Sequence, residues 1–105
     1  MQEIDFYLVD AFSDRAFGGN AAAVCPLEAW LSDETLLKMA KQHNQSETAF
    51  FVCSKGGIEL RWFTTLTEVN LCGHATLAAA HVLFTELDYP DSRIHFDTAS
   101  GRLTV

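Results

Sequence analysis

Cysteine, glycine and histidine stand side by side at positions 72–74, directly before an apolar run that continues to Phe84. The run contains no proline and no further glycine, so it predicts a helix from Gly73 to about Leu87. A helix begins with N–H groups that lack intrahelical partners and with a partial positive charge. Because glycine has no side chain, a ligand could approach these groups closely. The pattern therefore indicates a place where a carboxylate or phosphate group would bind.

The two neighbours of Gly73 add chemistry to this helix end. His74 would lie in the first turn, where the helix dipole favours the neutral imidazole, and it could donate a hydrogen bond or relay a proton. Cys72 would lie just before the helix, where a thiolate is electrostatically favoured. The structural alternative is that Gly73 forms a tight turn, His74 caps the helix and Cys72 is a small buried hydrophobe. Taken alone, the three residues fit both interpretations.

Glu47 is the second residue that could do chemistry. It stands in the stretch "NQSETAFF", just before Phe50 and Phe51, so its carboxyl group could be partly withdrawn from water. A carboxyl group placed in this way can take a proton and return it. The alternative is an exposed charge at a strand edge, or a hydrogen-bonded turn made with Ser46.

Other polar residues give weaker indications. The turn 17–20 could cradle a polar substrate group with its backbone amides and the Asn20 side chain, although Gly-Gly-Asn is common in ordinary turns. The histidines at positions 43, 81 and 95 lack the mutual spacing of metal ligands, so we expect no metal site. His81 is expected to be a buried histidine with its hydrogen bonds satisfied. Trp30 and Trp62 are expected in the core or at its rim.

The elements that must position these residues are mainly strands. Alternating β-branched and aromatic residues predict strands over 4–12, 47–54 and 58–64, with a tight turn at 55–57, and a strand–turn–strand over 93–105. A short strand over 21–27 is predicted to be ended by Pro26. A surface helix is predicted over 31–44, with Ser32 or Asp33 as its cap. The helix from Gly73 is apolar around its whole circumference, so it must be enclosed. We therefore expect a single α+β domain, residues 1–105, in which an antiparallel barrel-like sheet wraps a central helix, with the other helix outside.

Composition excludes several classes of function. The chain has 105 residues and a formal net charge of −7, which argues against nucleic-acid binding and against an anionic membrane surface. No signal peptide and no apolar run of about 20 residues is present, so a cytoplasmic protein is expected. The three cysteines are odd in number and widely spaced, which favours reduced thiols over disulfides.

Four segments, in this order, resemble the phenazine biosynthesis PhzF-like proteins of the diaminopimelate epimerase-like superfamily. They are residues 9–24 (VDAFSDRAFGGNAAAV), 46–51 (SETAFF), 60–84 (LRWFTTLTEVNLCGHATLAAAHVLF) and 96–105 (FDTASGRLTV). The resemblance implies two similar domains, each a barrel-like sheet around a central helix, with the active site in the cleft between them. It also implies proton transfer on a small carboxylate substrate without a cofactor or a metal.

The same resemblance assigns roles by position. Glu47 matches the general acid/base of the family, and His74 would assist it. Cys72 falls where the epimerase relatives place a catalytic cysteine. Those relatives continue with Gly-Asn-Gly, whereas this chain reads Gly73-His74-Ala75, which favours the PhzF-like branch. The residues that would line the substrate site are Gly73, Ser46, Asn20 and Cys72.

The chain matches only the first half of the family's length, which leaves three hypotheses open. The first is a PhzF-like isomerase that needs a second domain or forms a homodimer to complete its cleft. The second is a catalytically inactive, truncated domain that binds a small anion or associates with itself. The third is an epimerase or racemase based on Cys72.

Overall fold

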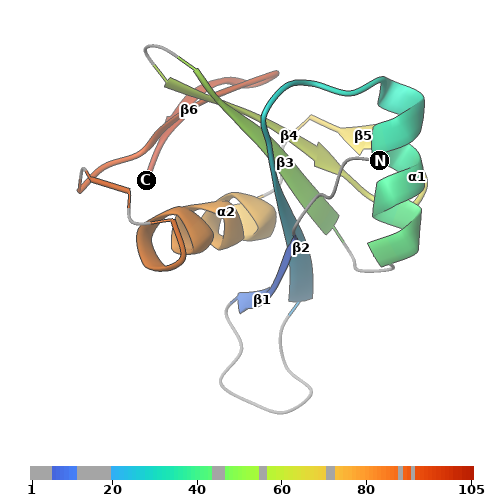
Figure 1. Cartoon of the computed structure of the whole chain (residues 1–105), viewed down its shortest axis with the longest axis horizontal. Helices are drawn as coiled ribbons and strands as arrows, with labels where there is room; N and C mark the ends of the chain where they lie inside the picture. The colour runs from blue at the N-terminus through green and yellow to red at the C-terminus, as the bar shows by residue number, and fades with distance from the viewer. Residues whose placement is uncertain are drawn as a thin grey trace.

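The computed structural model describes residues 6–11, 20–43, 47–54, 57–70, 73–87, 89–90 and 92–105. Within these ranges the chain forms two helices and seven strands (Figure 1). The helices are α1 (Asp33–His43) and α2 (Gly73–Thr85). The strands are β1 (Tyr7–Ala11), β2 (Asn20–Leu27), β3 (Glu47–Ser54), β4 (Gly57–Phe63), β5 (Glu68–Val69), β6 (His95–Thr98) and β7 (Gly101–Thr104).

The seven strands form one mixed sheet. Its order is β1-β2-β3-β4-β6-β7, and the two-residue β5 pairs with β4 beside this path. The pairs β2–β3 and β4–β6 are parallel and the others are antiparallel, so the expectation of an antiparallel sheet was wrong. The reason lies in the connections, because α1 stands between β2 and β3 and α2 stands between β4 and β6. A helical crossover returns the chain to the end from which it started, which makes the next strand parallel.

The sheet buries both of its faces, one against each helix. Figure 1 shows α2 and α1 on opposite sides of the strands. Because side chains alternate along a strand, the residues of β3 and β4 divide between the two sides. The cluster on the α2 side contains Ala22, Val24, Ala49, Phe51, Leu60, Trp62, Ala75, Ala78, Ala79 and Val82. The cluster on the α1 side contains Cys25, Leu36, Ala40, Phe50 and Phe63.

Helix α1 follows its sequence prediction closely. It begins at Asp33, and of the two expected caps Ser32 is the one used, since the backbone N–H of Thr35 donates to Ser32 Oγ at 3.2 Å. This bond satisfies one of the N–H groups that a helix leaves unpaired at its start. Leu36 and Ala40 are buried one turn apart, as the one-sided apolar stripe predicts. The helix is therefore fixed by its cap at one end and by a narrow apolar seam along its length.

Helix α2 is less enclosed than its sequence predicts. It packs against β1, β2 and β3, and most of its alanines are buried. Leu77 and Phe84 remain 39% and 37% exposed, and His81 is exposed as well, so the prediction of a buried histidine was wrong. The described strands cover one side of the helix, and these three residues lie along its other side. Neither helix in the described ranges is both long and apolar enough to cross a membrane.

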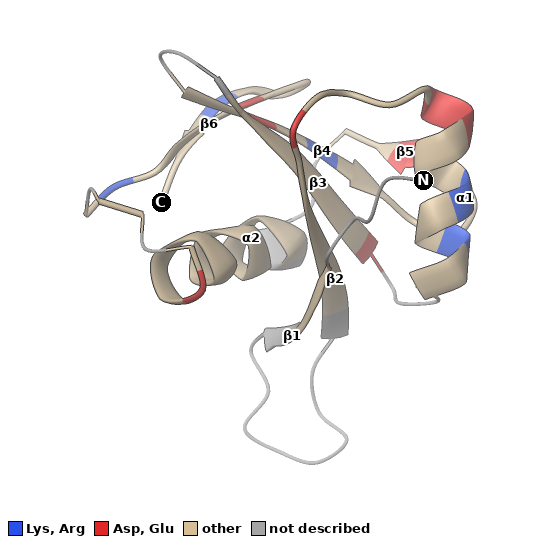
Figure 2. Ribbon diagram, viewed as in Figure 1, with Lys and Arg blue, Asp and Glu red and all other residues tan. Residues whose placement is uncertain are grey.

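Charge is distributed unequally between the helices. Figure 2 shows acidic and basic bands on α1, whereas α2 carries no charged residue before the acidic position that follows it, Glu86. An apolar helix of this kind depends on the sheet for its burial.

The path of the sheet runs from β1 to β7, and the described residues include no pairing between those two strands. Closure into a barrel therefore stays a prediction.

Candidate functional site

Glu47 is the first residue of β3, and the strand alternation places it on the α2 side of the sheet. Ala49 and Phe51, two and four residues further on, belong to the cluster on that side. Its register partner in the parallel pair with β2 is Ala22, which belongs to the same cluster. The side chain is half-buried. The backbone therefore places Glu47 at the start of an apolar strand, as the sequence predicts.

One oxygen of this carboxyl group lacks a hydrogen-bond partner. Glu47 Oε2 is buried, and within the described part of the chain it is the single side-chain oxygen or nitrogen reported as buried without such a partner. Burying a polar group without a hydrogen bond costs free energy, and the great majority of buried polar groups are paired. Such an exception in a folded protein calls for an explanation, and a catalytic role is one of the known explanations.

The amino end of α2 is held at the same end of the sheet. The indole N–H of Trp62 donates to Thr76 Oγ1 at 3.0 Å, and both side chains are buried. Trp62 pairs across the sheet with Ala49 on one side and with Val69 on the other. The first turn of α2 is therefore tied to a residue whose neighbour on β3 lies only two positions from Glu47. The carboxyl group and the helix start share one face and one end of the sheet.

Of the remaining predicted site residues, Gly73, His74 and Asn20 belong to this region by their position along the backbone. Helix α2 begins at Gly73, as predicted, and His74 lies in its first turn. Asn20 begins β2, two residues before Ala22, which pairs with the first residue of β3. The side chains of His74 and Asn20 lie outside the described part of the structure, as do the predicted site residues Ser46 and Cys72 entirely.

Directly behind Glu47, on the α1 side of the sheet, lies a group that the sequence did not single out. His43 Nδ1 is 3.4 Å from Oγ1 of the buried Thr48, and the ring of Phe6 stacks on the imidazole at 4.4 Å between centroids. Burial lowers the pKa of His43 below its ordinary value. The available signal was that His43 stands near the end of the predicted helix 31–44, shortly before the predicted strand 47–54 that contains Thr48.

A second polar cluster fixes α1 against the sheet. Arg61 on β4 donates to both carboxylate oxygens of Glu68, at 2.8 and 2.7 Å, and to Asp33 at 2.8 Å. Its guanidinium also lies 5.3 Å from the ring centroids of Trp30 and Phe63. The hydrogen bonds that Arg61 donates to Glu68, together with the nearby carboxylates, raise the pKa of Arg61. This cluster joins α1, β4 and β5, which gives it a structural purpose.

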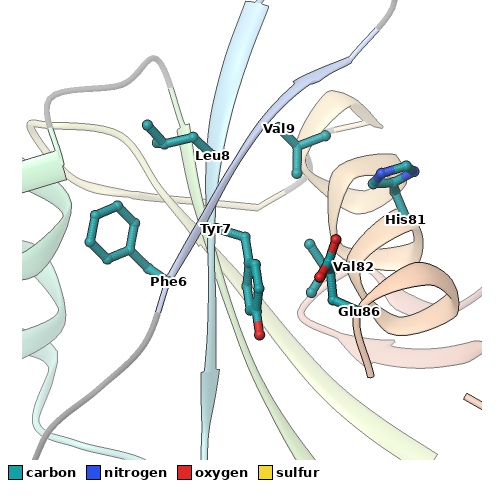
Figure 3. Close-up of a pocket in the computed structure, with 7 residues that line it drawn as sticks. All are labelled: Phe6, Tyr7, Leu8, Val9, His81, Val82 and Glu86. Carbon is teal, nitrogen blue, oxygen red and sulfur yellow. The ribbon is translucent and has the colours of Figure 1, made fainter. Parts of the chain in front are cut away.

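A groove of about 400 Å³ lies between β1 and α2. Figure 3 shows Tyr7 and Val9 on the side of β1 nearer to α2, whereas Phe6 and Leu8 point to the opposite side. His81, Val82 and Glu86 line the groove from α2. The described residues include no group of three or more side chains that could hold a metal ion.

Comparison with known proteins agrees with this architecture. An uncharacterized isomerase from Pseudomonas aeruginosa is 54% identical over 103 residues, which are 98% of this chain and 40% of that protein. The human phenazine biosynthesis-like domain-containing protein is 44% identical over 96% of this chain and 38% of its own length. The crystal structure of a PhzF-family phenazine biosynthesis protein from Enterococcus faecalis matches with a TM-score of 0.92 and 46% identity, covering 97% of this chain and 39% of that one.

These matches also give the extent of the likeness. The chain spans about 40% of the length of the first relatives it matches. The family model for phenazine biosynthesis-like proteins, PhzC-PhzF, matches residues 9–105 and so covers nearly the whole chain. On the strength of that match, and of a shared fold at this level of identity, the chain belongs to the PhzC-PhzF phenazine biosynthesis-like family.

Proposed function

We propose that this chain serves as the N-terminal part of a PhzF-like isomerase, which moves a proton on a small carboxylate-containing substrate without a cofactor. The observation that carries the proposal is the buried, unpartnered Oε2 of Glu47 on the face of the sheet that holds the start of α2. Relatives named as isomerases support the reaction class. Glu47 is the general acid/base.

The chemistry follows from a carboxylate placed opposite a helix start. Glu47 takes a proton from a carbon beside a carboxylate or a conjugated system, and the electron pair left behind spreads into that system. The N–H groups at the start of α2, where Gly73 permits close approach, hold the negative charge. Glu47 then returns the proton to another carbon, with His74 assisting. Nothing is oxidised or reduced, and the carboxylate is regenerated.

Substrate binding involves the residues around these two groups. Gly73 and Cys72 stand at the start of α2, Ser46 flanks Glu47, and Asn20 begins the strand next to β3. The relatives are longer, so the other side of the cleft comes from a second domain or from a second copy of this chain. A homodimer would place two helix starts opposite each other.

Solvent deuterium exchange tests the proposal directly. The chain is incubated in D2O with a panel of small carboxylic acids, both alone and together with the part of a relative that lies outside the matched region. Deuterium gained at carbon is read by NMR. Exchange is expected in the wild type and its loss in Glu47→Gln. Glu34→Gln is the matched control, because the side chain of Glu34 is exposed on α1. Equal exchange in Glu47→Gln and in the wild type would remove Glu47 from the mechanism.

The same assay separates the alternatives. If the chain binds a small acid but exchanges no proton, the inactive anion-binding domain is the better description. If alkylation of the thiols abolishes exchange, the hypothesis of an epimerase based on Cys72 gains support. Light scattering decides between a homodimer and a chain that needs a different partner. A strict monomer at high concentration would contradict the homodimer.

A further inference from the structure

His43, Thr48 and Phe6 meet on the α1 side of the sheet, directly behind Glu47. Thr48 follows Glu47 in β3 and is buried, and its Oγ1 lies 3.4 Å from His43 Nδ1. We propose that His43 is a positioning residue for Glu47 and acts through the hydroxyl group of Thr48. This inference rests on the proposed function of Glu47 as the acid/base.

The geometry of a strand start explains how the contact would act. Neighbouring side chains of a strand point to opposite faces, so Thr48 faces α1 whereas Glu47 faces the cluster around α2. Thr48 is β-branched, which gives its side chain few rotamers and couples the position of its hydroxyl to the backbone. Holding this hydroxyl at α1 therefore fixes the rotation of the first residues of β3. That rotation decides where the Glu47 carboxyl group points.

The imidazole is itself held from a second direction. The ring of Phe6 lies against it with an interplanar angle of 30° and a centroid distance of 4.4 Å. Phe6 precedes β1, and Figure 3 shows it on the side of β1 that faces away from α2. His43 ends α1. The residue before β1, the end of α1 and the start of β3 thus meet at one ring, so a change at His43 reaches the start of β3.

The protonation state of His43 alters this contact. Burial lowers the pKa of His43, so the ring is neutral near pH 7. Protonation makes both ring nitrogens donors, and the Thr48 hydroxyl must then accept from Nδ1. Arg61 pairs with Asp33 at the other end of α1, and Lys38 pairs with Glu34. The charged groups nearest to His43 in sequence are Lys41 on α1 and Glu47 on β3.

The first test reads the Glu47 carboxyl group by NMR. The full chain is labelled with ¹³C-glutamate, the Glu47 signal is assigned with Glu47→Gln, and its shift is followed against pH. In the wild type the signal should show a second inflection at the pH where His43 titrates. The inflection should vanish in His43→Phe and Thr48→Val and return in Thr48→Ser. Because Thr48→Val keeps the His43 charge, an inflection that persists there would show a direct field effect and overturn the proposal.

The second test is the rate of deuterium exchange into the acid identified for the wild type. Thr48→Val is expected to slow exchange about ten-fold or more, since a small displacement of a catalytic group costs that much, and Thr48→Ser should restore it. Thr104→Val is the matched control, because Thr104 Oγ1 lies 2.9 Å from His95 Nδ1 in a similar pair on β6 and β7. Its exchange should match the wild type.

The two tests fail in different ways. If the wild type exchanges no deuterium into any acid, the proposed function falls, and the NMR titration still decides whether His43 positions Glu47. If Thr48→Val exchanges as fast as the wild type, the positioning by His43 is refuted and the proposed function stands. Should Thr48→Val fail to fold, as judged by circular dichroism, His43→Phe and Thr48→Ser carry the same comparison.

Discussion

The bond between Trp62 and Thr76 supports the clearest prediction, because it joins the sheet to the start of α2. Trp62 is 1% exposed and Thr76 is 5% exposed. Thr76→Val keeps the shape of the side chain but removes the oxygen that accepts the indole N–H. A buried donor left without its acceptor costs about 1–3 kcal/mol. We therefore expect Thr76→Val to lower the free energy of unfolding by about that amount.

A double-mutant cycle separates this bond from other consequences of the substitutions. Trp62→Phe removes the donor and also leaves unfilled volume, so it is destabilising by itself. The double variant Trp62→Phe/Thr76→Val has no indole N–H, so no buried donor loses its acceptor. The double variant should therefore cost less than the sum of the single variants, with a coupling energy of about 1 kcal/mol. Urea unfolding followed by circular dichroism measures all four proteins.

The control lies on the same helix. Thr85 is exposed at the end of α2, and its hydroxyl donates to the His81 carbonyl at 2.7 Å. Thr85→Val should change stability by less than about 0.5 kcal/mol. If the Trp62 and Thr76 variants prove additive within about 0.5 kcal/mol, the bond does not hold the helix start. The account of how α2 is placed near Glu47 would then be wrong.

Four further predictions concern stability, each measured by chemical denaturation. Ser32→Ala should cost about 1 kcal/mol, because the cap of α1 is lost, and Ser32→Asp should cost little. Gly101→Ala should cost about 1–2 kcal/mol, since Gly101 has a φ of 100°. Burial lowers the pKa of His43 from 6.5, so the unfolded chain binds the proton more readily than the folded chain. The contribution of His43 to the free energy of unfolding should be complete above pH 6.5 and should decrease as the pH falls below that value. His43→Phe should make the free energy of unfolding depend less on pH in this range. Glu47→Leu should stabilise the fold by about 1 kcal/mol, because it removes a buried carboxylate oxygen that has no partner; a loss of stability would mean that the carboxyl group is satisfied in the free protein.

Local patterns predicted the elements well where one strong rule applied. The alternation in residues 47–54 matches β3, and the predicted start of the apolar helix at Gly73 is the start of α2. The cap of α1 was found because Ser32 stands before acidic residues and an apolar stripe. Pro26 was expected to end its strand but lies within β2. The register explains this. β1 pairs with β2 only as far as Val24, so at Pro26 the described residues of β2 pair with β3 alone, and proline is tolerated at such a sheet edge.

Other features depend on contacts that no local pattern contains. The parallel pairs β2–β3 and β4–β6 arise from crossovers, whose direction is not encoded in the strands themselves. The two-residue strand β5 is too short to show alternation. His81 was expected in the core because its neighbours are apolar, but the described strands cover the other side of α2. Of the site, the start of α2 and the side of Glu47 were predictable, whereas the contact between His43 and Thr48 required the fold.

The side on which Glu47 lies follows from the register of the sheet. Ala49 and Phe51 pack in the cluster on the α2 side, and a strand repeats every two residues, so Glu47 faces α2 as well. A slip of one residue between β2 and β3 would turn the carboxyl group toward α1 and exchange the side chains that β3 contributes to the two buried clusters. The free energy gained by burying Phe51 therefore also holds Glu47 in place. In this way a strong, non-directional force positions a carboxyl group that by itself destabilises the fold.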